Sequence, residues 1–98
     1  WLDGKDPNSK SVGVEFVGTS ISSGGNGTQY PKNLDATLSE NPFVKFHNVE
    51  RGYVSCDITP DEWQTHYRTV EYVDRKGAPL NTRAPFSVQN GQPRLNAL

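Results

Sequence analysis

The 98-residue sequence contains no methionine, a single cysteine and no long apolar run. Because Cys56 has no partner, an internal disulfide is excluded. One cysteine and two distant histidines, His47 and His66, offer no ligand pair at the spacing of a zinc site. No apolar run approaches the ~20 residues that a transmembrane helix needs, and the first residues lack the basic and apolar segments of a signal peptide. The absence of methionine, an initiator included, is what we expect of a fragment or a processed product.

The apolar content of the chain is also low. Hydrophobic residues make up 33% of it and the mean hydropathy is -0.73, so a core built by this chain alone would be thin. Two Trp, four Tyr and four Phe nevertheless supply large groups to bury, which a disordered chain lacks. We therefore expect an ordered segment that covers something larger. The net charge is -1 and the charges are scattered, which indicates neither a nucleic-acid stripe nor a patch for anionic membranes.

Alternation of apolar and polar residues, bounded by Gly, Pro and Asn, predicts a mainly β fold. The segments 43–48 and 53–58 are close enough along the chain to pair as a hairpin. Together the strands predict an antiparallel or mixed sheet that resembles the outer half of a two-sheet sandwich. The expected strands lie near residues 12–17, 43–48, 53–58, 65–73 and 84–88.

Little helix is expected. Residues 34–39 favour one or two helical turns, which end before Asn41 because Pro42 restricts the residue that precedes it. Thr59-Pro60-Asp61-Glu62 has the composition of a capping box and predicts a single helical turn over 60–64. Residues 1–11 have a loop composition, and the tail over 93–98 is expected to fray.

The same alternation predicts which side chains face inward. Phe16 and Phe46 fall on the apolar faces of the first two expected strands, whereas His47 points away from Phe46. Cys56 also falls on an apolar face, and we expect it to be buried there as a small hydrophobe.

A segment rich in serine and glycine, Thr19–Gly25, admits two interpretations. Its hydroxyls and flexible backbone can present donors to a phosphate, as glycine-rich nests do. Alternatively, it is a structural turn whose serines bond nearby backbone groups, which is the commoner case and the one that the sequence favours. A P-loop is excluded because its lysine-containing pattern is absent. Ser20, Ser22 and Ser23 are the candidates to lie near a substrate or behind the groups that contact it.

Arg51 is the fourth candidate. Arg51-Gly52-Tyr53 stands just before an expected strand, and an arginine there can bind a phosphate through two parallel hydrogen bonds. The simpler alternative is a hairpin corner with a solvated arginine, and the sequence slightly favours it.

Five motifs in this order resemble the C-terminal end of the alkaline phosphatase D (PhoD-like) family of metallophosphoesterases, over roughly residues 12–95. The chain departs from the family at Phe43, where members often carry histidine. The motifs are Glu15-Phe16-Val17-Gly18-Thr19-Ser20-Ile21-Ser22-Ser23-Gly24-Gly25, Asn41-Pro42-Phe43-Val44-Lys45-Phe46, Arg51-Gly52-Tyr53-Val54, Thr59-Pro60-Asp61-Glu62-Trp63 and Tyr67-Arg68.

The resemblance implies that all 98 residues form the C-terminal part of one phosphatase domain and complete a calcineurin-like metallophosphoesterase sandwich. It implies a secreted or periplasmic bacterial enzyme that hydrolyses phosphate esters to scavenge phosphate, in a family that includes phospholipase D-type members. It also implies that the rest of the phosphatase chain is the partner of this segment and carries the ligands of calcium and iron. This segment would then bind no metal and be inactive alone.

A second function class stays open, namely a small β-rich binding module without catalysis. Its basis is the aromatic set Trp63, Tyr67 and Tyr72, which would suit carbohydrate stacking if all three lay on one surface. Aromatic residues at such spacing are more often packed between sheets.

Overall fold

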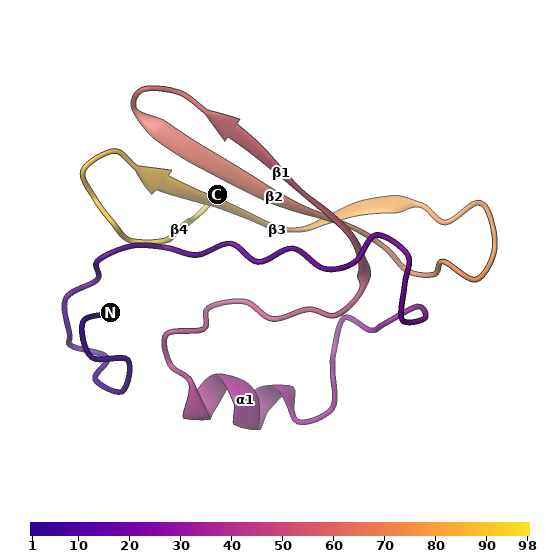
Figure 1. The fold of residues 1–98 in the computed structure, drawn as a ribbon, viewed down its shortest axis with the longest axis horizontal. Coiled ribbons are helices and arrows are strands. Elements are labelled where there is room, and N and C mark those ends of the chain that lie inside the picture. Colours follow the sequence, from indigo (N-terminus) through magenta and orange to yellow (C-terminus); the bar gives the residue numbers. More distant parts are fainter.

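A computed structural model describes all residues from 1 to 98. It contains one helix, α1 (Leu34–Glu40), and four strands, β1 (Arg51–Ile58), β2 (Glu62–Val70), β3 (Leu80–Gln89) and β4 (Asn96–Ala97). The strands form a single antiparallel sheet in the order β1-β2-β3-β4, and the first fifty residues run beneath it as α1 and long extended segments (Figure 1). The mainly β fold predicted from the sequence is confirmed.

The first hairpin joins β1 and β2 in a tight turn, with Ile58 opposite Trp63. The hydroxyl of Thr59 accepts hydrogen bonds from the backbone N–H groups of Asp61 and Glu62, at 3.3 and 3.2 Å. These are the contacts expected of a helix cap, but here they close a β turn, so the helical turn predicted over 60–64 is wrong. Strand-favouring residues follow Glu62 at once, and they pair across the hairpin instead of continuing a helix.

The two extended segments 12–17 and 43–48 are not strands, which corrects two predicted strands and the hairpin predicted between 43–48 and 53–58. They lie over one face of the sheet instead. The Phe16 ring stacks on Trp63 with centroids 6.2 Å apart, and the Phe46 ring lies 5.1 Å from that of Tyr67. The alternation therefore identified the inward side chains correctly, but not the backbone partners, since none lies beside these segments within the chain.

The remaining strand limits differ modestly from expectation. β2 covers 62–70 where 65–73 was predicted, and β3 covers 80–89 where 84–88 was predicted. The tail predicted to fray instead forms β4, in which Ala97 pairs with Phe86. Residues 1–11 contain turns and no helix or strand, and α1 ends before Asn41 as predicted.

Arg83 occupies an irregular position in the pairing of β2 with β3. Tyr67 pairs with Ala84 and Arg68 pairs with Thr82, so Arg83 has no partner residue on β2 and forms a β-bulge. A bulge changes the direction in which the extra side chain points. This one allows Arg83 to reach a carboxylate outside the sheet.

Very little of the molecule is a closed apolar core. Ala84 is the one buried hydrophobic residue. The other buried side chains are polar and belong to Glu50, Thr65, Thr69 and Ser87. The aromatic rings of Phe46, Tyr67 and Phe86 pack together, but only as a half-exposed layer. Many large apolar side chains remain exposed, among them Leu2, Val12, Val17, Ile21, Ile58 and Leu98.

Cys56 is exposed, which corrects the expectation that it is buried. It lies opposite Thr65 on the covered face of the sheet, with its Sγ 3.8 Å from the Thr65 Oγ1. The covering rings of Phe16 and Phe46 pack on rings of β2 and β3, whereas Cys56 lies on the edge strand β1.

Candidate functional site

Two of the four candidate residues are in direct contact. The Arg51 Nη1 atom donates hydrogen bonds to the Ser20 Oγ at 2.9 Å and to the Thr19 Oγ1 at 3.2 Å. The Arg51 Nε atom donates to the backbone oxygen of Gly25 at 2.9 Å. The serine- and glycine-rich segment over residues 19–28 is called the Ser/Gly loop. One guanidinium thus joins the start of this loop to its middle, at Gly25.

The interior of the Ser/Gly loop is shaped by local bonds. The Ser20 hydroxyl donates to the backbone oxygen of Ser23 at 2.7 Å, which is the local side chain-to-backbone bond that the structural interpretation expected. Gly24 and Gly25 have φ angles of 84° and 79°, in the left-handed region that favours glycine. An added Cβ on Gly24 would lie 3.6 Å from the Arg51 Nη2, so the guanidinium lies directly against the loop.

Ser22 and Ser23 lie at the exposed tip of this loop. Neither hydroxyl has a hydrogen-bond partner within the chain, in contrast to the Ser20 hydroxyl. The four candidates therefore divide into two pairs. Arg51 and Ser20 hold the loop together, and Ser22 and Ser23 are presented outward by it.

The far end of the Ser/Gly loop is also held by hydrogen bonds. The Val49 N–H donates to the Thr28 oxygen at 3.1 Å. The Asn26 Oδ1 accepts from the backbone N–H of Val73 at 2.8 Å, which ties the loop to the connection between β2 and β3. Gly27 has a φ of 70°, and a Cβ there would lie 1.8 Å from the Val49 oxygen, so only glycine fits.

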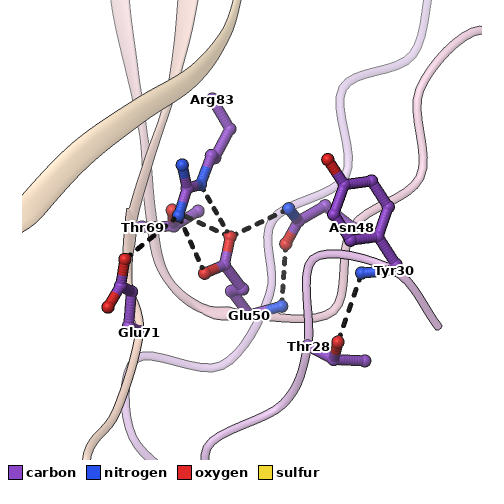
Figure 2. A network of polar contacts seen from close by, with 7 residues as sticks. All are labelled: Thr28, Tyr30, Asn48, Glu50, Thr69, Glu71 and Arg83. Carbon is purple, nitrogen blue, oxygen red and sulfur yellow. Dashed lines mark hydrogen bonds and ion pairs between the residues drawn. The ribbon is translucent and has the colours of Figure 1, made fainter.

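A buried carboxylate next to Arg51 was not identified from the sequence. Glu50 is only 4% exposed, and Arg83 binds it with Nε on Oε1 at 2.9 Å and Nη2 on Oε2 at 3.3 Å (Figure 2). The Asn48 Nδ2 and the Thr69 Oγ1 donate to the same Oε1 at 3.0 and 3.3 Å. The Asn48 Oδ1 in turn accepts the Glu50 N–H at 2.8 Å. No local signal marks this network, because Glu50 and Arg83 lie 33 residues apart.

These contacts decide the ionisation of Glu50. Burial raises its pKa, but the hydrogen bond from Arg83, the hydrogen bond from Asn48 and the charge of Arg83 together outweigh burial and leave the pKa lowered. The hydrogen bond to Glu50 likewise raises the pKa of Arg83. Both groups therefore remain charged at neutral pH, as a fully hydrogen-bonded pair.

The three aromatic residues behind the binding-module alternative do not form one surface, because Trp63 and Tyr67 lie on the covered face of β2 and Tyr72 lies beyond the end of that strand. Trp63 stacks on Phe16, and Tyr67 lies in the aromatic layer, where burial raises its pKa. Tyr72 lies instead under the guanidinium of Arg75, which is 3.8 Å from the ring centroid. This arrangement gives no stacking platform for a sugar.

The chain contains no group of three or more His, Cys, Asp or Glu side chains arranged to hold a metal ion, so its residues do not fit a calcium or iron site. His47, which was predicted to point away from Phe46, is exposed, and His66 is half-buried on β2. No helix is long and apolar enough to cross a membrane.

The 98 residues thus form a β-rich sheet with an anchored loop on one edge and scarcely any enclosed core. The family model described as PhoD-like phosphatase matches residues 2–67. The chain therefore belongs to the PhoD-like phosphatase family, as its motifs predicted.

Two relatives support the assignment. The chain is 46% identical over 94 residues to alkaline phosphatase D of Bacillus subtilis (strain 168), a match that covers 96% of this chain and 16% of that protein. A solved structure entitled "Structure of PhoD" matches with a TM-score of 0.79 and 46% identity, over 85% of this chain and 16% of that one. The chain thus spans about a sixth of the length of these relatives.

Proposed function

We propose that these 98 residues are the C-terminal part of one phosphatase domain, in an enzyme that hydrolyses phosphate esters like alkaline phosphatase D. The observation that carries the proposal is 46% identity across 96% of the chain to that protein. Because the chain corresponds to only 16% of the relative and holds no metal-binding cluster, its own role is to build the fold and to supply one loop.

The partner of this segment is the remainder of the phosphatase chain. The backbone groups of residues 12–19 make no backbone–backbone hydrogen bond, although polar backbone groups in folded proteins are normally paired. Two apolar side chains of this segment are exposed, Val12 at 58% and Val17 at 67%. A groove of ≈ 480 Å³ lined by Ile58, Trp63 and Val88 adds further uncovered apolar surface. Strands from the remaining chain would satisfy both needs and complete the calcineurin-like sandwich.

The Ser/Gly loop is the part of this segment that faces the substrate. The free hydroxyls of Ser22 and Ser23, and the left-handed glycines that follow them, support this assignment, because such a loop presents donors to phosphate oxygens. The Nε and Nη1 donors of Arg51 are already hydrogen-bonded to the loop itself. It therefore acts by holding Ser20 and the loop in place rather than as the primary phosphate ligand.

The remaining features of the whole enzyme follow from the family. It acts on phosphomonoesters or phosphodiesters and is exported from a bacterial cell. Its calcium and iron are held by residues outside these 98, since the residues present here do not fit a metal.

The test compares the isolated chain with the whole phosphatase that contains it. Each is purified and supplied with calcium and iron, and the hydrolysis of p-nitrophenyl phosphate and bis-p-nitrophenyl phosphate is followed. We expect turnover by the whole enzyme and none by the 98 residues. Metal-dependent turnover by the 98 residues alone, or a whole protein inactive on both esters, would overturn the proposal.

A further inference from the structure

Glu50 and Arg51 are neighbours in the chain but act in opposite directions. The carboxylate of Glu50 points into the molecule and binds Arg83, whereas the guanidinium of Arg51 points outward and binds the Ser/Gly loop. The short segment that carries both residues, 49–52, is therefore attached to the sheet on one side and to the loop on the other.

The attachment to the sheet is made by two strands. Thr69 comes from β2, and Arg83 comes from the bulge in β3, where it has no partner residue on β2. Because both oxygens of Glu50 accept hydrogen bonds from side chains around them, the carboxylate has one well-defined orientation (Figure 2).

The attachment to the loop is made at three points within residues 49–52. The Val49 N–H binds the Thr28 oxygen at 3.1 Å, and the Gly52 N–H binds the Ser20 oxygen at 3.2 Å. Between them, the Arg51 side chain binds the loop from within. The position of the loop thus follows the position of segment 49–52, which is held by the pairing of Arg51 and Gly52 with β2 and by the contacts of Glu50.

We propose that Glu50, held by Arg83, is a positioning residue that fixes segment 49–52 so that the Ser/Gly loop presents Ser22 and Ser23 in one geometry. The inference rests on the proposed function, in which this loop faces a phosphate ester. Small misplacements of groups that position a substrate can lower rates by ~10²-fold, so a second support behind the loop has a measurable effect.

The kinetic test uses the whole phosphatase with p-nitrophenyl phosphate. Glu50→Gln keeps the shape of the side chain and removes its charge, and Glu40→Gln on exposed α1 is the matched control. We expect Glu50→Gln to lower kcat/KM by about 10-fold, mainly through KM, because a loosened loop binds the phosphate less well. Glu40→Gln should stay within twofold of the parent.

A double variant separates positioning from an independent effect. If Glu50 acts through the loop that Arg51 holds, the kcat/KM of the double variant Glu50→Gln with Arg51→Ala should be no lower than that of the worse single variant. Losses that multiply would overturn the proposal. An unchanged kcat/KM in a Glu50→Gln enzyme with a lowered Tm would also overturn it, because Glu50 would then be structural only.

A second readout does not depend on catalysis. Hydrogen–deuterium exchange of the whole Glu50→Gln protein should quicken at the amides of residues 20–28 and stay slow in β2 and β3. This result would support the positioning role even in a protein inactive on phosphate esters, where only the proposed function would have failed. Faster exchange spread evenly over the sheet, or none in the loop, would overturn the role. Should Glu50→Gln not fold, Thr69→Val, which removes one hydrogen bond to Glu50, is expected to give the same loop-specific change, only smaller.

Discussion

The Arg51 Nη1 lies 2.9 Å from the Ser20 Oγ, although 31 residues separate the two in the chain. This contact joins the start of β1 to the Ser/Gly loop, and the Gly52 N–H and Ser20 oxygen reinforce it at 3.2 Å. Two residues that the sequence proposed separately therefore belong to one structural unit. Each substitution considered for the loop, the sheet and the link between them is made in the whole phosphatase.

Arg51→Ala should loosen the loop and leave the sheet intact. The substitution removes three side-chain hydrogen bonds to the loop and no side-chain hydrogen bond to β2 or β3, so we expect kcat/KM to fall by about 10–100-fold with a small change in Tm. Arg51→Lys, which cannot reproduce the forked geometry, should recover only part of the loss. Thermal melting and steady-state kinetics on the same preparations check this. An unfolded Arg51→Ala protein whose folded remainder keeps its rate would show that the arginine serves the stability of the fold only.

Phe46→Ala should do the reverse. The Phe46 ring packs 5.1 Å from that of Tyr67 and 5.9 Å from that of Phe86, and it covers the centre of the sheet. Removing it should cost roughly 3–5 kcal/mol of unfolding free energy, an upper range because the ring is only half-buried here. Denaturant unfolding measures the loss, and kcat of the folded enzyme should hold. A lowered kcat at unchanged stability would place Phe46 near the chemistry instead.

Gly27→Ala should displace the loop. A Cβ on Gly27 would lie 1.8 Å from the Val49 oxygen and would also occupy a φ of 70°, so the backbone must shift at a cost of about 1–3 kcal/mol. Gly13→Ala is the matched control, because nothing lies within 4 Å of its added Cβ. We expect chemical denaturation to show a loss for Gly27→Ala and none for Gly13→Ala. Equal stability of the two variants would contradict the close packing of Gly27 against the Val49 oxygen.

The unfolding free energy should depend on pH through the ionisation of Glu50. Its pKa in the folded protein is below the ordinary value of 4.5, so as pH falls the unfolded chain takes up the proton first. The stabilisation is therefore complete above about pH 4.5 and is lost as pH falls through the folded-state pKa. We expect the difference in unfolding free energy between the parent and Glu50→Gln to shrink over that window. A difference that stays constant from pH 6 to pH 3 would rule out this linkage.

Local features of the fold could be predicted from the sequence. The helix at residues 34–40 and the inward placement of Phe16 and Phe46 depend on neighbours in the chain, and both are confirmed. The partners of backbone segments depend on the whole fold, which is why the expected strands at 12–17 and 43–48 are absent. Their alternation fits a pleated strand, but no neighbouring strand is present among these residues to pair with them.

The candidate site was predictable in its residues but not in its connections. Serine, glycine and arginine types marked the Ser/Gly loop and Arg51, yet only the fold shows that Ser20 is bound by Arg51 while Ser22 is free. Glu50 was missed because a charged residue reads as exposed in a sequence of low hydropathy. Its burial depends on Arg83, which reaches it from a bulge that no local pattern announces.

The most direct measurement of the central claim is the kinetics of the whole phosphatase carrying Ser22→Ala and Ser23→Ala together, with its metal content determined in parallel. Both side chains are exposed and make no hydrogen bond within the chain, so folding and metal content should be unchanged. We predict that kcat/KM for p-nitrophenyl phosphate falls by about 10-fold or more, because the loop loses donors to the phosphate. A rate equal to that of the parent would show that the loop does not face the substrate, and a loss of metal would show that this segment helps to hold the ions.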